Sequence, residues 1–259
     1  MSGQHHTSAG AAPLATSGLV GRTALVTGAS RGIGAATARA FAAAGARVAL
    51  LARTGAALDT LAAELAAERD DAPGALPVVC DLGDARAVDA AVAQVVAAFD
   101  GPPDVLVNNA GVFAVAPAHE TSVDTFTALV DANLVAPFRL VRALLPAMRE
   151  RGAGHVVTVG SVADRATFPG NAAYASSKYG LRALHEVLRL ELRGTGVRAT
   201  LVSPGPVDTP LWDALDPDTR EGFTPRAAML RAEDVADAIL YAATCPASVN
   251  VDELRLSRA

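Results

Sequence analysis

Two kinds of segment alternate along the chain: short aliphatic runs, and longer alanine-rich stretches whose apolar residues recur with the period of a helix. The short runs predict buried strands and the longer stretches predict amphipathic helices. The seven predicted strands are 23–27, 47–52, 77–80, 104–107, 155–159, 198–202 and 249–256. The six predicted helices are 32–44, 55–69, 85–99, 123–149, 174–193 and 232–243.

This alternation predicts an α/β fold, because each return to a parallel strand needs a crossover helix. We expect a Rossmann-type, doubly wound, parallel seven-stranded sheet with helices on both faces, built as a single domain over residues 19–259. Residues 1–18 carry no charged side chain and predict a flexible tail. Five prolines between residues 204 and 225 prevent one long helix there, so an insertion at about 205–231 is expected to act as a lid.

The composition of the 259 residues is that of an ordinary globular protein. The 22 basic and 27 acidic residues give a formal charge of −5, and no basic run suggests a contact with nucleic acid or membrane. No uncharged apolar stretch has the roughly 18 to 20 residues that a membrane-spanning helix needs. Cys80 and Cys245 lack C-x-x-C spacing, which favours a reducing compartment, and we expect a cytoplasmic protein.

A glycine-rich turn follows the first predicted strand. Residues 27–34 read T-G-x-x-x-G-x-G, and the next predicted helix begins inside this stretch. Glycines at such a turn let the backbone approach a pyrophosphate, to which the helix N-terminus offers free N–H donors. An isolated match could be only a tight turn, but its place after the first strand of a βαβ unit indicates a dinucleotide site.

Further motifs follow in order along the chain. They are N-N-A-G at 108–111, Asn133 in the next helix, Ser161 at the end of the fifth strand, Y-x-x-x-K at 174–178 and P-G at 204–205. With these motifs in this order, the chain resembles the short-chain dehydrogenase/reductase (SDR) family over residues 21–256. Residues 250–256 depart from many family members in lacking a glycine-rich stretch around the last strand, which leaves the C-terminal interface open.

Lys178 is the only lysine in the chain, although 22 residues are Lys or Arg. Tyr174 and Lys178 are four residues apart, so they project from one face of a helix. A nearby ammonium favours the phenolate, and we therefore expect Lys178 to lower the pKa of Tyr174. An ammonium can also hold ribose hydroxyls, a task that suits a guanidinium poorly.

The resemblance implies a role for each of four residues. Tyr174 would exchange a proton with the carbonyl oxygen, and Ser161 would orient that oxygen. Lys178 would act on Tyr174 and bind ribose, and Asn133 would anchor a water that completes a proton relay. Alone, Ser161 and Asn133 could be purely structural. The histidines show no ligand spacing, so no metal is expected.

The end of the second strand indicates which cofactor is used. Ala52 stands where an acidic residue would bind the ribose 2′-hydroxyl of NAD(H), and Arg31 and Arg53 could instead hold a 2′-phosphate. NADP(H) is therefore expected, with NAD(H) possible. By resemblance, Asp81 would bind adenine and Thr209 the nicotinamide carboxamide. The full expected cofactor set is Thr27, Gly28, Ser30, Arg31, Gly32, Ile33, Gly34, Arg53, Asp81, Leu82, Asn109, Ala110, Gly111, Tyr174, Lys178, Pro204, Gly205, Val207 and Thr209.

The expected substrate pocket is apolar. It comprises Ser161, Val162, Phe168, Tyr174, Leu211, Trp212 and Leu215. The leading hypothesis is an NADPH-dependent reductase of a small to medium apolar ketone or aldehyde, working reversibly. An NAD-linked alcohol dehydrogenase and a non-catalytic NADP(H)-binding sensor are the alternatives. The resemblance further implies a homodimer or homotetramer formed through the helices at 123–149 and 174–193.

Overall fold

All seven predicted strands join one parallel sheet in the computed structural model, which describes residues 18–68 and 74–259. The strands are β1 (Thr23–Thr27), β2 (Arg47–Ala52), β3 (Leu76–Val79), β4 (Val105–Asn108), β5 (Gly154–Val159), β6 (Val197–Pro204) and β7 (Glu253–Leu256). Their order in the sheet is β3-β2-β1-β4-β5-β6-β7, and every neighbouring pair is parallel. This arrangement confirms the expected Rossmann-type, doubly wound fold.

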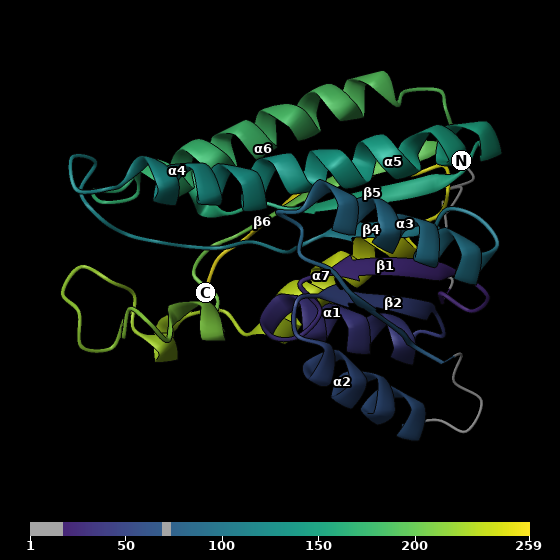
Figure 1. Cartoon of the computed structure of the whole chain (residues 1–259), viewed down its shortest axis with the longest axis horizontal. Coiled ribbons are helices and arrows are strands. Elements are labelled where there is room, and N and C mark those ends of the chain that lie inside the picture. Colours follow the sequence, from purple (N-terminus) through teal and green to yellow (C-terminus); the bar gives the residue numbers. More distant parts are fainter. Residues whose placement is uncertain (1–17, 69–73) are drawn as a thin grey trace, which may run out of the picture.

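Helices cover both faces of the sheet (Figure 1). They are α1 (Gly32–Ala43), α2 (Gly55–Ala67), α3 (Ala85–Phe99), α4 (Val123–Val130), α5 (Ala136–Arg151), α6 (Ala172–Glu191) and α7 (Ala232–Thr244). One apolar core packs α1, α2 and α7 against the sheet, and the other packs α3, α5 and α6 against its opposite face. Successive strand residues alternate between the cores, as Ala24 and Leu25 do, because side chains of a strand point to opposite faces.

The long helix predicted at 123–149 is interrupted. Residues Asp131–Val135 form a π-helical turn between α4 and α5, and α5 continues to Arg151. In the π turn the Ala136 N–H bonds the carbonyl of Asp131, five residues back. Apolar periodicity cannot reveal such a turn, because it adds one residue without ending the helix.

The last predicted strand, 249–256, is too long. Only Glu253–Leu256 pair with β6, while the Asn250 side chain donates to the Ala199 carbonyl and accepts from the Ala199 N–H. The side chain thus takes the place of backbone pairing at this edge of the sheet.

At other elements the predicted and observed ends differ by a few residues: α6 begins at Ala172 and not at residue 174. Arg69 and, except for Gly18, the predicted tail at 1–18 lie outside the described residues.

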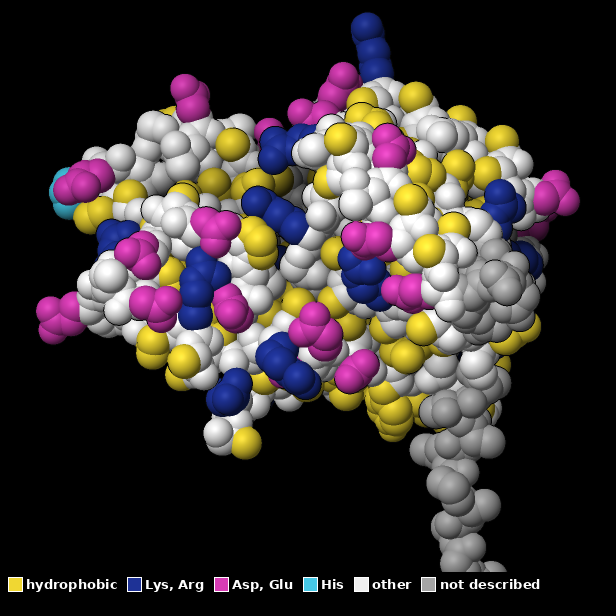
Figure 2. Space-filling view, turned by 90° about the horizontal axis from the view of Figure 1, so that it is seen from below, with side chains coloured by type: hydrophobic (Ala, Val, Ile, Leu, Met, Phe, Trp, Pro, Cys, Tyr) yellow, Lys and Arg dark blue, Asp and Glu magenta, His cyan; other side chains and the backbone are white. Residues whose placement is uncertain are grey.

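Charge is distributed evenly on the face shown in Figure 2, where basic and acidic side chains are interspersed. None of the helices within 18–68 and 74–259 is both long and apolar enough to cross a membrane.

The sheet order reverses between β1 and β4, since the chain first winds outward to β3 and then returns to add β4 beside β1. At such a switch point the loops after neighbouring strands diverge, and a crevice opens outside their carboxyl ends. This end of the sheet is where the predicted motifs meet.

Candidate active site

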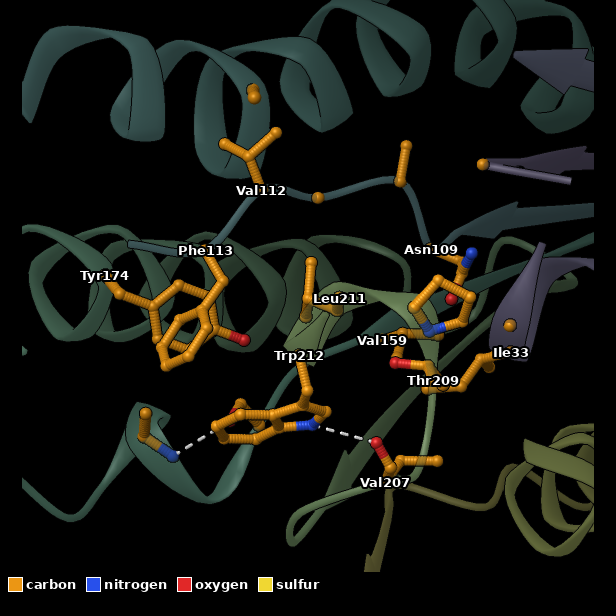
Figure 3. Close-up of a pocket in the computed structure, with 18 of the residues that line it drawn as sticks. Ile33, Asn109, Val112, Phe113, Val159, Tyr174, Val207, Thr209, Leu211 and Trp212 are labelled. Carbon is orange, nitrogen blue, oxygen red and sulfur yellow. Dashed lines mark hydrogen bonds between the residues drawn. The ribbon is translucent and has the colours of Figure 1, made fainter. Parts of the chain in front are cut away.

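A cavity of about 1150 Å³ lies at the carboxyl ends of the central strands (Figure 3). It brings together most of the residues singled out in the sequence: Gly28, Ser30, Arg31, Gly32, Ile33, Arg53, Asp81, Leu82, Asn109, Ala110, Gly111, Ser161, Val162, Phe168, Tyr174, Lys178, Pro204, Gly205, Val207, Thr209, Leu211 and Trp212. Four predicted residues do not line it: Thr27, Gly34, Asn133 and Leu215.

Thr27 and Gly34 lie behind the cavity and contact residues that line it. The Thr27 hydroxyl accepts hydrogen bonds from the N–H groups of Asn109 and Ala110, both at 2.9 Å, and so ties the N-N-A-G loop to β1. A Cβ on Gly34 would lie 2.2 Å from the Gly28 carbonyl oxygen. Only glycine therefore lets α1 approach the turn so closely.

The N-terminus of α1 faces this cavity with free donors. The turn residues Gly28 and Gly32 have φ values of 66° and 55°, which glycine adopts without strain. Arg31 is the N-cap residue, yet within 18–68 and 74–259 no side chain caps the helix, and no acidic residue stands in its first turn. Unpaired N–H groups and the positive end of the helix dipole fit a pyrophosphate.

Two arginines stand at one end of the cavity. Arg31 and Arg53 line it and are exposed, and within the described parts of the chain neither pairs with a carboxylate. Asp81 also lines this end, and one of its carboxylate oxygens accepts from the Gly83 N–H at 3.0 Å. Two free guanidinium groups, with Ala52 in place of an acidic residue at the end of β2, fit a ribose that carries a 2′-phosphate.

Ser161, Tyr174 and Lys178 meet at the other end. Ser161 follows β5 and caps a short 3-10 turn, while Tyr174 and Lys178 lie one turn apart on α6. All three line the cavity, and Ser161 lies close enough to the phenol to lower its pKa. Lys178 is only 5% exposed, its Nζ donates to the Val159 carbonyl at 3.0 Å, and it lies 5.7 Å from the centre of the Tyr174 ring.

The protonation of these groups differs from the prediction that Lys178 lowers the pKa of Tyr174. Burial raises the pKa of Tyr174 to about 12, an effect that its hydrogen bond with Ser161 opposes and the charge of Asp164 reinforces. Burial lowers the pKa of Lys178 to about 8, against the charge of Asp164. For both groups desolvation is the largest effect on the pKa, and spacing in the sequence cannot reveal it. At neutral pH the phenol is therefore protonated.

Asn133 lies in the π turn and is fully buried. Its amide donates to the Val112 carbonyl at 3.0 Å and to the Ser177 hydroxyl at 3.0 Å, and it accepts from the Val112 N–H at 2.8 Å. Ser177 in turn donates to the Tyr174 carbonyl at 2.7 Å. The Asn133 side chain thus links the loop after β4 to the Tyr174 turn of α6 from behind the cavity.

An aromatic wall borders the tyrosine. The ring of Phe113 meets Tyr174 edge-on at 4.7 Å between centroids and Trp212 at 5.1 Å, and Phe223 packs on Trp212 at 6.2 Å (Figure 3). The indole N–H of Trp212 donates to the Val207 carbonyl at 2.9 Å, so its apolar faces are left for packing. Phe113 and Phe223 could not be predicted from the sequence, because no motif in the loops that carry them indicates a place in the pocket.

Arg226 fastens the segment 205–231. Its side chain donates to Asp208 at 2.6 Å and to Asp213 at 2.7 Å, and its backbone N–H donates to Asp218 at 2.7 Å. A bridge between Val207 and Leu230 closes the base of the segment. Trp212 and Phe223 are held over the cavity in this way, while Leu215 points elsewhere.

A nucleotide cleft at the switch point, beside a tyrosine, a serine and a lysine, defines a dinucleotide-dependent oxidoreductase. The chain belongs to the short-chain dehydrogenase family, whose model matches residues 22–220. It is thus an oxidoreductase that interconverts CH–OH and C=O groups with NAD(P).

Named relatives agree with this assignment. The chain is 36% identical over 236 residues to an uncharacterized oxidoreductase of Staphylococcus haemolyticus. The aligned region covers 91% of this chain and 96% of that protein. It is also 36% identical to the D-threitol dehydrogenase of Mycolicibacterium smegmatis, over 89% of each chain.

Solved structures share the fold. An alcohol dehydrogenase from the archaeon Thermococcus sibiricus, complexed with 5-hydroxy-NADP, has a TM-score of 0.81 and 30% identity over 92% of this chain and 97% of that one. A metagenomic short-chain oxidoreductase in complex with NADP has a TM-score of 0.78 and 36% identity over 92% and 98% of the two chains.

Proposed function

We propose that the protein is an NADPH-dependent reductase that converts an apolar ketone or aldehyde to an alcohol. The observation that carries this proposal is the meeting of Ser161, Tyr174 and Lys178 in the cavity that the glycine turn and the two arginines also line. Carbonyl reduction needs a proton donor where the oxygen gains charge, and the phenol of Tyr174 would supply it.

The chain's own residues would divide the work between binding and proton transfer. When bound, the nicotinamide supplies hydride to the carbonyl carbon. Ser161 hydrogen-bonds the carbonyl oxygen, and Tyr174 gives it the proton. Lys178 binds the ribose hydroxyls, and Asn133 supports the proton relay by fixing the Tyr174 turn through Ser177. The segment 205–231 acts as a lid whose Trp212 excludes water from the reacting atoms.

The experiment that tests this function measures oxidation of NADPH and of NADH against ketones, aldehydes, diketones, quinones and β-ketoacyl thioesters. We expect turnover of apolar carbonyl compounds with NADPH. Binding of NADPH without turnover of any member would contradict the proposal.

Cofactor preference is expected to depend on Arg53. Its exposed guanidinium at the end of β2 lacks a carboxylate partner among the described residues, and so it is available to a 2′-phosphate. Arg53→Asp should lower the ratio of kcat/KM for NADPH to that for NADH by about 100-fold, since it removes a charge-assisted bond and adds a repulsive charge. Arg47→Asp, at the start of the same strand, is the matched control and should leave the ratio unchanged. An unaltered ratio in Arg53→Asp would remove Arg53 from the phosphate site.

We infer that the protein works as a homodimer or homotetramer in the cytoplasm. Several apolar side chains are exposed on α4, α5 and α6: Phe126, Phe138, Tyr179, Val187 and Leu190. Exposed apolar patches on neighbouring helices are typical of subunit interfaces. Sedimentation at micromolar concentration should give a dimer or tetramer, and Phe138→Glu should shift it toward monomer; monomer alone in the wild type would contradict the inference.

The proposed cytoplasmic location is supported by the two cysteines, which are both free thiols, as in a reducing compartment.

A further inference from the structure

A buried carboxylate lies directly beneath the catalytic serine. Asp164 is fully buried, three residues after Ser161. One of its oxygens accepts from the Ser161 N–H at 3.3 Å and from the Ser203 hydroxyl at 2.5 Å. The other accepts from Nε of Arg165 at 2.7 Å. The carboxylate therefore fixes the backbone of Ser161 to β6.

The charge of this carboxylate is only partly neutralised. Among the residues that the structure describes, Arg165 is the single cation paired with Asp164, and the same guanidinium also pairs with Glu253 of β7 at 2.5 Å. Two carboxylates thus share one guanidinium, and the cluster carries a net negative charge. On its inner side this cluster faces α6. The titratable and charged groups around Asp164 are Arg165, Glu253, Tyr174 and Lys178.

Capping alone does not require a charge at this place. The turn after Ser161 needs an acceptor oxygen, which the amide of asparagine would supply as well. Burying an ionised carboxylate costs free energy, and a buried ion pair is in itself weak support for stability. The carboxylate oxygen that is bonded to Ser203 lies against Gly160, where an added Cβ would come within 2.5 Å of it, and Lys178 donates to the carbonyl of Val159, the residue before Gly160. Besides Arg165, the buried ammonium of Lys178 is therefore a nearby group that the negative charge of Asp164 would favour.

We propose that Asp164 is a positioning residue of this site, which fixes Ser161 and supplies the negative charge that holds Lys178 as an ammonium beside the Tyr174 ring. The proposal rests on the proposed reductase function for its effect on turnover. Its electrostatic part concerns the protein alone. The direction agrees with the protonation of Lys178, whose pKa the charge of Asp164 raises against the effect of burial.

The test uses the fact that Lys178 is the only lysine. Protein labelled with ¹³Cε-lysine gives one side-chain NMR signal, whose shift against pH reports the titration of Lys178 alone. In Asp164→Asn we expect its midpoint to fall by about one pH unit, the lower end of what a nearby opposite charge produces. In Arg165→Gln, which removes the neutralising cation, we expect it to rise. The kcat for carbonyl reduction should fall about tenfold in Asp164→Asn, because Lys178 loses the negative charge that holds it as an ammonium beside Tyr174.

Opposite shifts in the two variants would support the proposal, and midpoints that stay at the wild-type value would overturn it. If Asp164→Asn fails to fold, Arg165→Gln decides the matter by the sign of its shift. A role in capping alone would leave the Lys178 titration unchanged in both variants. A wild-type protein that reduces no carbonyl compound would contradict the proposed function, whereas the Lys178 titration would still decide the electrostatic role of Asp164.

Discussion

Tyr174→Phe is expected to lower the turnover number for carbonyl reduction by about 10²- to 10⁴-fold, the range that a positioned general acid contributes. The substitution removes the hydroxyl and retains the ring that packs edge-on against Phe113. The shape of the cavity is therefore preserved. Binding of NADPH should change little, because the glycine turn and the arginines lie at the other end of the cleft.

Both quantities can be measured on the same sample. Turnover is followed by the absorbance of NADPH, and binding by the fluorescence of Trp212, the only tryptophan, which lines the cavity. Tyr179→Phe is the matched control, since Tyr179 lies on the same helix but is exposed and does not line this cavity. Turnover should be unchanged in the control. Wild-type turnover in Tyr174→Phe would exclude Tyr174 as the acid.

Features of this protein that depend on neighbouring residues in the sequence could be predicted. Strand and helix periods predicted the sheet and its covering helices, since each face of the sheet buries its own set of alternating residues. The glycine turn and the spacing of Tyr174 and Lys178 are local as well. Helical geometry places the latter two on one face, and the structure has them there.

Features that depend on distant contacts could not be predicted. Phe113 joins the aromatic wall only because the segment 205–231 folds back over the loop after β4. The pKa of Tyr174 depends on how far burial excludes water, which the spacing of Tyr174 and Lys178 cannot show. The π turn at Asp131–Val135 likewise leaves the apolar pattern intact. Such features require the packed structure.

Arg198→Met is expected to lower the free energy of unfolding by about 3–5 kcal/mol, because several buried carbonyl groups would lose a charged donor. Arg198 lies on β6 and is 9% exposed. Its guanidinium donates to carbonyl oxygens of Ala243 at 3.2 Å, Cys245 at 3.1 Å and Val249 at 3.2 Å. A single side chain therefore supplies hydrogen bonds to carbonyl groups at the end of α7 and in the segment that leads into β7.

Urea denaturation at fixed protein concentration measures this effect, and Arg189→Met provides the matched control. Arg189 is partly exposed and pairs with Asp252 at 2.8 Å, so its loss should cost less than about 1 kcal/mol. A change in Arg198→Met as small as in the control would mean that water satisfies these carbonyls. Since β7 carries the Glu253 that holds Arg165, a loosened β7 should also lower turnover before the protein unfolds. Loss of activity at lower urea than loss of helical signal, in Arg198→Met alone, would connect this edge of the sheet to the site.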